Sequence, residues 1–122
     1  MPSSSPSRLA KRLERCQADL RATQAQIAEL SYVMQGSVVK RTKRCGQPEC
    51  RCQHAPEYEH GPYYQWTRKI RAKTVTEVLT PTDARLYRQW ITNGRRLRRL
   101  VARLYRISER AARYRAQENA SD

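Results

Sequence analysis

A cluster of cysteines near the middle of the chain constrains its fold more than any other feature of the sequence. Cys45, Cys50 and Cys52 fall within eight residues, and His60 follows eight positions after the last of them. Thiolate and imidazole groups suit Zn²⁺, and a structural zinc site needs four such ligands in a tetrahedron. The sequence therefore predicts a structural zinc site formed by Cys45, Cys50, Cys52 and His60.

Other interpretations of this cluster stay open at the level of sequence. His54 is a competing fourth ligand, but it follows Cys52 by only two residues, and we favour His60. The thiols could instead be free, hold an iron–sulfur cluster, or form a disulfide, which needs an oxidising compartment. A catalytic zinc would need an open coordination position and a nearby acid or base, for which Glu57 and Glu59 are candidates. A closed structural site is the simpler expectation, and it predicts that the protein is not an enzyme.

The composition limits what else the chain can be. It has 122 residues, no Phe and an apolar fraction of 39%, so we expect one small domain with extensions. Its 25 Lys and Arg outnumber 11 Asp and Glu, and the formal net charge of +14 favours anionic partners. Residues 1–7 are rich in Ser and Pro and are expected to form a disordered tail without a secretory signal. No apolar run reaches the length of a membrane span, and the cysteines are of the reduced type, so we expect a soluble cytoplasmic protein.

The segment 8–35 has the pattern of a long N-terminal helix. Its periodic positions recur at alternating steps of four and three residues, which is the heptad repeat of a coiled coil. Cys16 falls on this repeat and is therefore predicted to be a small seam residue rather than a metal ligand. The predicted seam residues of this helix are Leu13, Leu20, Ile27 and Leu30.

The middle segment, 36–80, has the pattern of a small β-module that contains the zinc site. Three runs of alternating or β-branched residues predict strands at Ser37–Thr42, Tyr63–Ile70 and Lys73–Thr80. The last two strands would form a hairpin with Arg71 and Ala72 near its turn. A three-stranded antiparallel sheet is too small to be stable alone, so the metal and a covering helix are expected to support it.

The segment 81–117 predicts a second long helix with the same repeat, and residues 118–122 are expected to fray. Asn93-Gly94 could divide this helix, but the repeat continues in phase and favours one continuous helix. Its predicted seam residues are Leu97, Leu100, Leu104 and Ile107. The helices could pair within one chain, but two full seams favour a homodimer or larger oligomer. The predicted fold class is α+β, with two long heptad-patterned helices flanking a small antiparallel zinc-bound β-module.

Basic residues form two groups that predict contact with nucleic acid. One group is a stripe about 25 Å long on the second helix, beside its seam. This stripe consists of Arg96, Arg99, Arg103, Arg106, Arg110 and Arg113. The second group surrounds the aromatic residues of the β-module, and consists of Lys40, Arg41, Lys43, Arg44, Arg68, Lys69, Arg71 and Lys73. Guanidinium groups suit phosphate, although the same stripe could bind acids on a partner helix or be solvated.

The order of these motifs resembles a known family. Gly36-Ser37-Val38-Val39 precedes Cys45-Gly46-x-Pro48-x-Cys50-x-Cys52, and His60-Gly61-Pro62-Tyr63-Tyr64 follows, ahead of Lys73-Thr74 and a helix rich in Leu and Arg. In residues 36–105 the chain is similar to a family of small uncharacterised proteins of bacteria and archaea, often associated with transposases and mobile elements. The resemblance implies a metal at the matching cysteines and His60, and it suggests an accessory role in transposition. It also implies a prokaryotic protein, for which association with the nucleoid is left open.

These observations together predict a nucleic-acid-binding accessory protein without catalytic activity, with DNA favoured over RNA. The partner protein suggested by the resemblance is a transposase or recombinase. The alternative is a coiled-coil assembly or adaptor protein whose basic surface binds an acidic protein partner. No contact with a membrane is expected.

Overall fold

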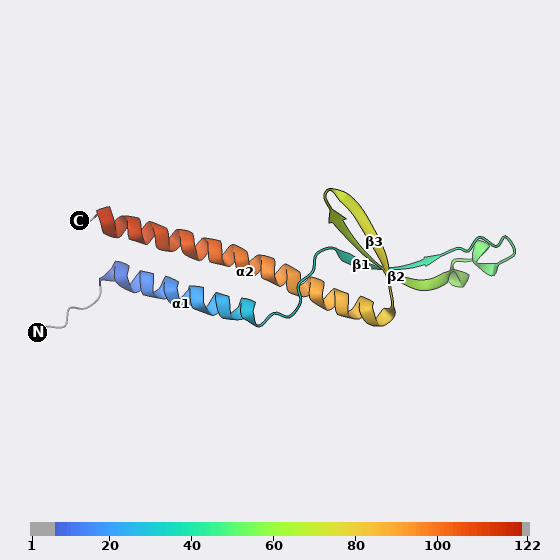
Figure 1. Ribbon diagram of the computed structural model, residues 1–122, viewed down its shortest axis with the longest axis horizontal. Coiled ribbons are helices and arrows are strands. Elements are labelled where there is room, and N and C mark those ends of the chain that lie inside the picture. Colours follow the sequence, from blue (N-terminus) through green and yellow to red (C-terminus); the bar gives the residue numbers. More distant parts are fainter. Residues whose placement is uncertain (1–6, 121–122) are drawn as a thin grey trace, which may run out of the picture. The chain divides into compact units, whose positions relative to one another are not determined.

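The computed structural model describes residues 7–120. The disordered tail predicted for the first residues lies outside this range except for Ser7, whose hydroxyl accepts a hydrogen bond from the Ala10 N–H and caps the first helix. The helices and strands, shown in Figure 1, are α1 (Arg8–Ala28), β1 (Ser37–Lys43), β2 (His60–Ile70), β3 (Lys73–Leu79) and α2 (Pro81–Ala120). The predicted α+β class, with two helices and a small antiparallel sheet, is confirmed.

The chain divides into two compact units. The helical unit contains α1 and the part of α2 from Arg95 onward, and the sheet unit spans Tyr32–Gly94. Each unit therefore includes part of α2, and each has its own buried side chains. No helix within residues 7–120 is long and apolar enough to cross a bilayer.

In the helical unit, α1 and α2 run side by side in opposite directions (Figure 1). The buried side chains are Cys16 and Thr23 from α1 and Leu100 and Ile107 from α2. The Thr23 hydroxyl donates a hydrogen bond of 2.8 Å to the Asp19 carbonyl oxygen, so this buried polar group is satisfied within its own helix. Burial of each large aliphatic side chain stabilises such a pair by about 1.5–3 kcal/mol.

The other predicted seam residues are half-buried in this unit: Leu13, Leu20, Ile27, Leu30, Leu97 and Leu104. The apolar stripes of the two helices are thus covered within a single chain. The coiled coil and the homodimer therefore stay predictions, because the two helices of a single chain can bury this seam against each other.

The prediction that the first helix continues to residue 35 is wrong, because α1 ends at Ala28. The Glu29 N–H bonds to the Ala25 carbonyl oxygen and the Leu30 N–H to that of Ile27, which closes the last turn. Further along, the Met34 N–H donates to the Trp90 carbonyl oxygen over 3.0 Å, and backbone contacts with α2 replace helical ones. The heptad spacing extends past Ala28 because this irregular segment also places apolar residues such as Leu30 and Met34 in half-buried positions. Its Tyr32 ring contacts Trp90 of α2.

The second helix is continuous through Asn93 and Gly94, as the unbroken repeat predicts. A Cβ atom added at Gly94 would lie 2.2 Å from the Met34 carbonyl oxygen, so the glycine allows the chain to pass close to α2. The Asn93 side-chain amide also donates to the Tyr32 carbonyl oxygen over 3.1 Å. The expected fraying from residue 118 is wrong for residues 118–120, which are helical, and the last two residues lie outside the described range.

The three strands form an antiparallel sheet in the order β1-β2-β3. The hairpin turn predicted near Arg71 and Ala72 lies there, and both residues have positive φ angles of 50° and 66°. Two central residues with positive φ are characteristic of the type I′ turn, whose twist matches that of the strands. β2 begins at His60, three residues earlier than predicted, and the register shifts between Arg41 and Lys43 beside it.

An aromatic cluster forms the core of the sheet unit. The Trp66 ring meets the Tyr87 ring edge to face with centroids 5.2 Å apart, and Tyr32 meets Trp90 in the same way at 5.1 Å. The Trp66 indole N–H donates to the Gln35 carbonyl oxygen over 2.8 Å. The contact between Trp66 and Tyr87 therefore holds the sheet against α2.

Candidate metal centre and arginine groove

The four predicted ligands come from the loop that joins β1 to β2. Cys45 lies just after β1, Cys50 and Cys52 flank the start of a 3₁₀ helix, η1 (Arg51–Gln53), and His60 is the first residue of β2. A second 3₁₀ helix, η2 (Pro56–Tyr58), reverses the chain between them. The antiparallel pairing of β1 and β2 thus brings both ends of the loop together.

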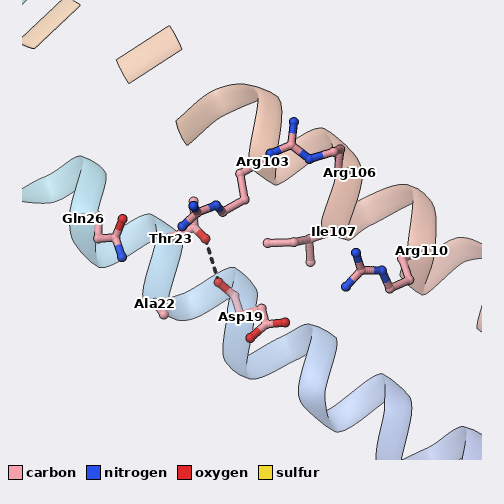
Figure 2. A pocket seen from close by; sticks show the side chains of 8 residues that line it. All are labelled: Asp19, Ala22, Thr23, Gln26, Arg103, Arg106, Ile107 and Arg110. Carbon is pink, nitrogen blue, oxygen red and sulfur yellow. Dashed lines mark hydrogen bonds between the residues drawn. The ribbon is translucent and has the colours of Figure 1, made fainter. Parts of the chain in front are cut away.

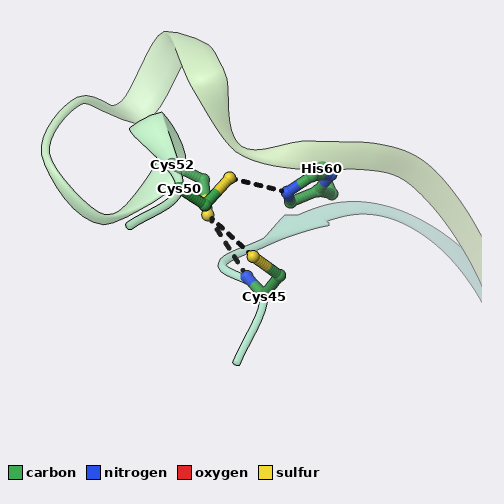
Figure 3. A group of neighbouring side chains, drawn as sticks. All are labelled: Cys45, Cys50, Cys52 and His60. Carbon is green, nitrogen blue, oxygen red and sulfur yellow. Dashed lines mark hydrogen bonds between the residues drawn. The ribbon is translucent and has the colours of Figure 1, made fainter. Parts of the chain in front are cut away.

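The ligand atoms of these four residues converge, as Figure 3 shows. All four atoms lie within 4.8 Å of one another. The Sγ atoms of Cys45 and Cys52 are 3.5 Å apart, and Cys50 Sγ is 3.3 Å from His60 Nε2. Ligands about 2.0–2.3 Å from a tetrahedral zinc ion are separated by roughly 3.3–3.8 Å. The cluster is therefore close enough to hold a metal ion, and its thiols are free rather than joined in disulfides.

The loop gives the thiols different acidities. A backbone hydrogen bond from Cys52 lowers the pKa of Cys50 to about 6, with further hydrogen bonds from the His60 and cysteine side chains. Burial raises the pKa of Cys52 to about 11, although the Cys45 N–H donates to its Sγ over 3.3 Å. Hydrogen bonds therefore favour the thiolate form of Cys50, whereas burial favours the protonated form of Cys52, whose proton a metal ion would have to displace.

The competing candidates lie outside this cluster. His54 is exposed at the end of η1, where its backbone N–H bonds to the Arg51 carbonyl oxygen. Glu59 accepts a hydrogen bond of 2.6 Å from the Thr42 hydroxyl, and Glu57 is exposed in η2. None of these three belongs to the group of converging ligands, so the structure favours His60 as the fourth ligand.

The basic residues of the β-module are exposed except for Arg68. The Arg68 guanidinium lies 3.7 Å from the centre of the Trp66 ring and forms a salt bridge of 2.9 Å with Glu77. The Arg68 guanidinium is thus already engaged by two side chains of the sheet, which counts against its predicted contact with nucleic acid. The Lys43 ammonium group lies 5.0 Å from the centre of the Tyr63 ring but keeps its charge at the surface.

Most of the arginine stripe lines a groove between α1 and α2 in the helical unit. One stretch of the groove, of about 380 Å³, has Arg103, Arg106 and Arg110 on the α2 side (Figure 2). An adjoining stretch of about 330 Å³ adds Arg96 and Arg99. We call the groove lined by these five residues the arginine groove. Its α1 side consists of Asp19, Ala22, Thr23 and Gln26.

The α1 side of this groove was not predicted from the sequence. Gln26 lines both stretches, and Asp19 is the single carboxylate among the lining residues. The helical spacing of Asp19 and Gln26 indicates that both residues flank the seam of α1. It does not indicate that they lie opposite the arginines of α2.

The arginines of the groove form no ion pairs among the described residues. Within residues 7–120, no ion pair or side-chain hydrogen bond involves Arg96, Arg99, Arg103, Arg106 or Arg110. Arg113, the sixth member of the stripe, lies 4.0 Å from Glu109 in an exposed i,i+4 pair, which contributes little. The five arginines of the groove therefore form a row of positive charge without ion-pair partners among the described residues.

These features define a small α+β protein whose β-hairpin loop carries a Cys₃His cluster able to hold a metal ion. The chain belongs to the family described as a domain of unknown function (DUF6788), whose model matches residues 13–89. The predicted membership of an uncharacterised family is thereby confirmed. The matched residues include all four candidate ligands and end before Arg96. No curated protein and no solved structure matches the chain.

Proposed function

We propose that this protein binds nucleic acid through the arginine groove, with DNA favoured over RNA, and that it is not an enzyme. The observation that carries the proposal is the row of five exposed arginines from Arg96 to Arg110, which have no ion-pair partner within the described residues 7–120. At 1.5 Å per residue the row is ~21 Å long. A single strand of duplex DNA has one phosphate per ~3.4 Å, so about six phosphates fit this length.

The energetics of the helix support a polyanionic ligand. Like charges three or four residues apart destabilise a helix by about 0.2–0.5 kcal/mol per pair. The row from Arg96 to Arg110 contains four successive pairs of this kind, and the nearest carboxylate lining the groove is that of Asp19. Folding alone does not favour this arrangement, whereas phosphates along the groove would remove the repulsion and accept bidentate hydrogen bonds.

We further propose that the Cys₃His cluster holds a structural zinc ion. Three thiolates and one imidazole form a complete tetrahedral set, which leaves no open position for a substrate or water. The four ligands connect the ends of the loop, and the sheet unit has little other buried apolar surface. The metal would therefore stabilise the loop and the sheet without taking part in catalysis.

The association with a transposase or recombinase rests on the resemblance of the sequence motifs, and it stays a prediction. The same holds for the homodimer, which would present two arginine grooves to one duplex. An acidic protein partner is the competing outcome, because a row of arginines attracts carboxylates as well as phosphates.

Charge reversal in the groove tests the proposal. We expect Arg99→Glu with Arg103→Glu to lower the affinity for a 25-base-pair duplex at least tenfold at physiological salt, because phosphate contacts dominate such affinity. The matched control is Arg95→Glu with Arg98→Glu, which makes the same change in net charge on α2 outside the residues that line the groove. Binding should be measured by fluorescence anisotropy after nuclease treatment of the purified protein.

An equal loss of affinity in both double variants would contradict the proposal that the arginine groove binds nucleic acid. Failure of the unmodified protein to bind any DNA or RNA, together with recovery of an acidic protein after nuclease treatment, would favour the adaptor function instead.

A further inference from the structure

The sheet has one face that is covered and one that is not. Trp66 contacts Tyr87, and the Arg88 guanidinium lies 5.6 Å from the centre of the Tyr64 ring, so α2 covers the face that carries Tyr64 and Trp66. Side chains alternate along a strand, which places Tyr63, Gln65, Thr67 and Lys69 of β2 on the opposite face. We call this second face, with its cross-strand partners on β1 and β3, the open face.

Several side chains of the open face are exposed to solvent, among them Arg41, Lys69 and Thr76. Val78, which is the β3 partner of Gln65, is 70% exposed there. Gln65 also has a partner on β1, Val39, and the next pair on the same face joins Arg41 to Tyr63. The open face is therefore a polar surface with an unusually exposed apolar residue, as expected of a surface that meets a partner.

The charge of the open face is positive. Arg41 and Lys69 lie on it, whereas Glu77, the one carboxylate of the three strands, pairs in register with Trp66 on the covered face and binds Arg68. Arg71 adds charge at the hairpin turn, and Lys43 and Arg44 add charge at the other end. Basic residues thus lie at both ends of a face that is ~20 Å long, and this distribution is complementary to a polyanion.

We propose that the open face reads base edges in the major groove of duplex DNA. The major groove admits a two-stranded β-ribbon, and β1 with β2 forms such a ribbon. Arg41 carries the fork of donors that recognises guanine, and Gln65 carries the amide that recognises adenine. Thr67 and Thr76, whose hydroxyl oxygens are 3.3 Å apart, offer methyl groups suited to thymine.

A duplex fits this face better than a single strand does. Proteins that bind single strands on a sheet stack successive bases on exposed aromatic side chains. Tyr63 is the one aromatic residue that the alternation places on the open face, and its ring is already in contact with the Lys43 ammonium group. Tyr64 and Trp66 lie on the covered face, so a platform for stacked bases is missing from these strands.

This inference rests on the proposed function, because it assigns sequence recognition to the sheet and phosphate affinity to the arginine groove. The test is selection from a library of duplex DNA with a randomised centre, using the full-length, metal-loaded protein. We expect one sequence to be enriched. Arg41→Ala and Gln65→Ala should each reduce discrimination at one base pair roughly 10- to 100-fold.

Lys40→Ala is the matched control, because it removes one charge from the neighbouring position on β1 but faces the covered side with its partner Tyr64. This variant should weaken binding to all sequences alike and leave the enriched sequence unchanged. Metal content and circular dichroism of each variant establish that the sheet is intact.

Two outcomes would overturn the inference while leaving the arginine groove in place. The first is binding of the library without enrichment, and the second is enrichment that neither Arg41→Ala nor Gln65→Ala alters. A preference for single-stranded over duplex DNA would also overturn it. Absence of binding to every nucleic acid tested would overturn the proposed function itself, and this inference with it.

Discussion

The two units of this protein are stabilised in different ways. The helical unit buries an apolar seam between α1 and α2, with Leu100 and Ile107 among its buried residues. The sheet unit has a half-buried aromatic cluster around Trp66 and a fully buried thiol, Cys52, among ligands that can hold a metal ion. Ordinary apolar packing supports the first unit, whereas the second has a small core that the proposed metal site would cross-link.

The units also differ in where their positive charge lies and in how the family model covers them. The family model matches the metal cluster but ends before the arginines of the groove. In the helical unit the charge follows one groove, while in the sheet unit it surrounds a face with hydrogen-bonding side chains. We therefore propose that the helical unit supplies affinity for phosphates and that the sheet unit recognises the DNA sequence. The following experiments test the two units separately.

The largest effect is expected from Cys50→Ser in the sheet unit. Loss of one of four ligands should abolish stoichiometric metal binding and destabilise the unit by several kcal/mol, because metal binding and folding are coupled in such sites. Metal analysis and thermal unfolding measure both effects. Cys16→Ser is the control, since Cys16 is buried in the helical seam and should leave metal content unchanged. Retention of metal by the Cys50→Ser variant would contradict the proposal that Cys50 is a metal ligand.

Ile107→Ala probes the helical unit in the same way. Ile107 is 6% exposed, and removal of its side chain should cost about 2–5 kcal/mol through lost burial and a residual cavity. Unfolding in urea followed by circular dichroism measures the change. Metal content should stay at the level of the unmodified protein, and a loss of metal in this variant would show that the two units are not independently stabilised.

Gly94→Ala tests the close approach of residue 34 to α2. Alanine is favoured over glycine inside a helix by about 1 kcal/mol, yet the new Cβ would overlap the Met34 carbonyl oxygen. We expect a net destabilisation of about 1–3 kcal/mol, as for overpacked sites. Gly46→Ala is the control, because its Cβ would meet no atom within 4 Å. Stabilisation by Gly94→Ala would mean that the two segments do not approach as described.

The smallest effect is a gain of stability in the β2–β3 turn. Arg71 and Ala72 both have positive φ angles, which cost about 1 kcal/mol or more for residues other than glycine and asparagine. Replacement by the preferred Asn-Gly pair should raise the stability of the sheet unit by about 1 kcal/mol. A calorimetric melting temperature that falls instead would show that this turn is not of type I′.

The sequence was informative where a residue's chemistry depends on its neighbours along the chain. The spacing of Cys45, Cys50 and Cys52 predicted the converging ligands, and alternation in β2 predicted the strand whose Trp66 packs in the core. The arginine stripe followed from helical periodicity, and the structure places five of its six members along one groove.

The errors of prediction arose where contacts come from distant residues. The heptad repeat predicted a helix up to residue 35, but α1 ends at Ala28, and the Met34 N–H bonds to the Trp90 carbonyl oxygen of α2 instead. Gly94 was considered as a possible break in the second helix. Its lack of a side chain instead allows the close approach of Met34, which lies sixty residues earlier in the chain. Arg68 was grouped with exposed basic residues, but its cross-strand neighbour Glu77 and the ring of Trp66 occupy it. Periodicity gives the face of a residue but not the identity of its partner.

The salt dependence of DNA binding tests the central claim most directly. Contacts with five phosphates through the arginine groove predict that log K falls with log salt concentration with a slope of about −4 to −5 for duplex DNA. Reversal of Arg99 and Arg103 should make the slope shallower by about 2, while reversal of Arg95 and Arg98 should change it by less than 1. A slope near zero for the unmodified protein, or one that the Arg99 and Arg103 variant leaves unchanged, would contradict the claim that this groove binds phosphates.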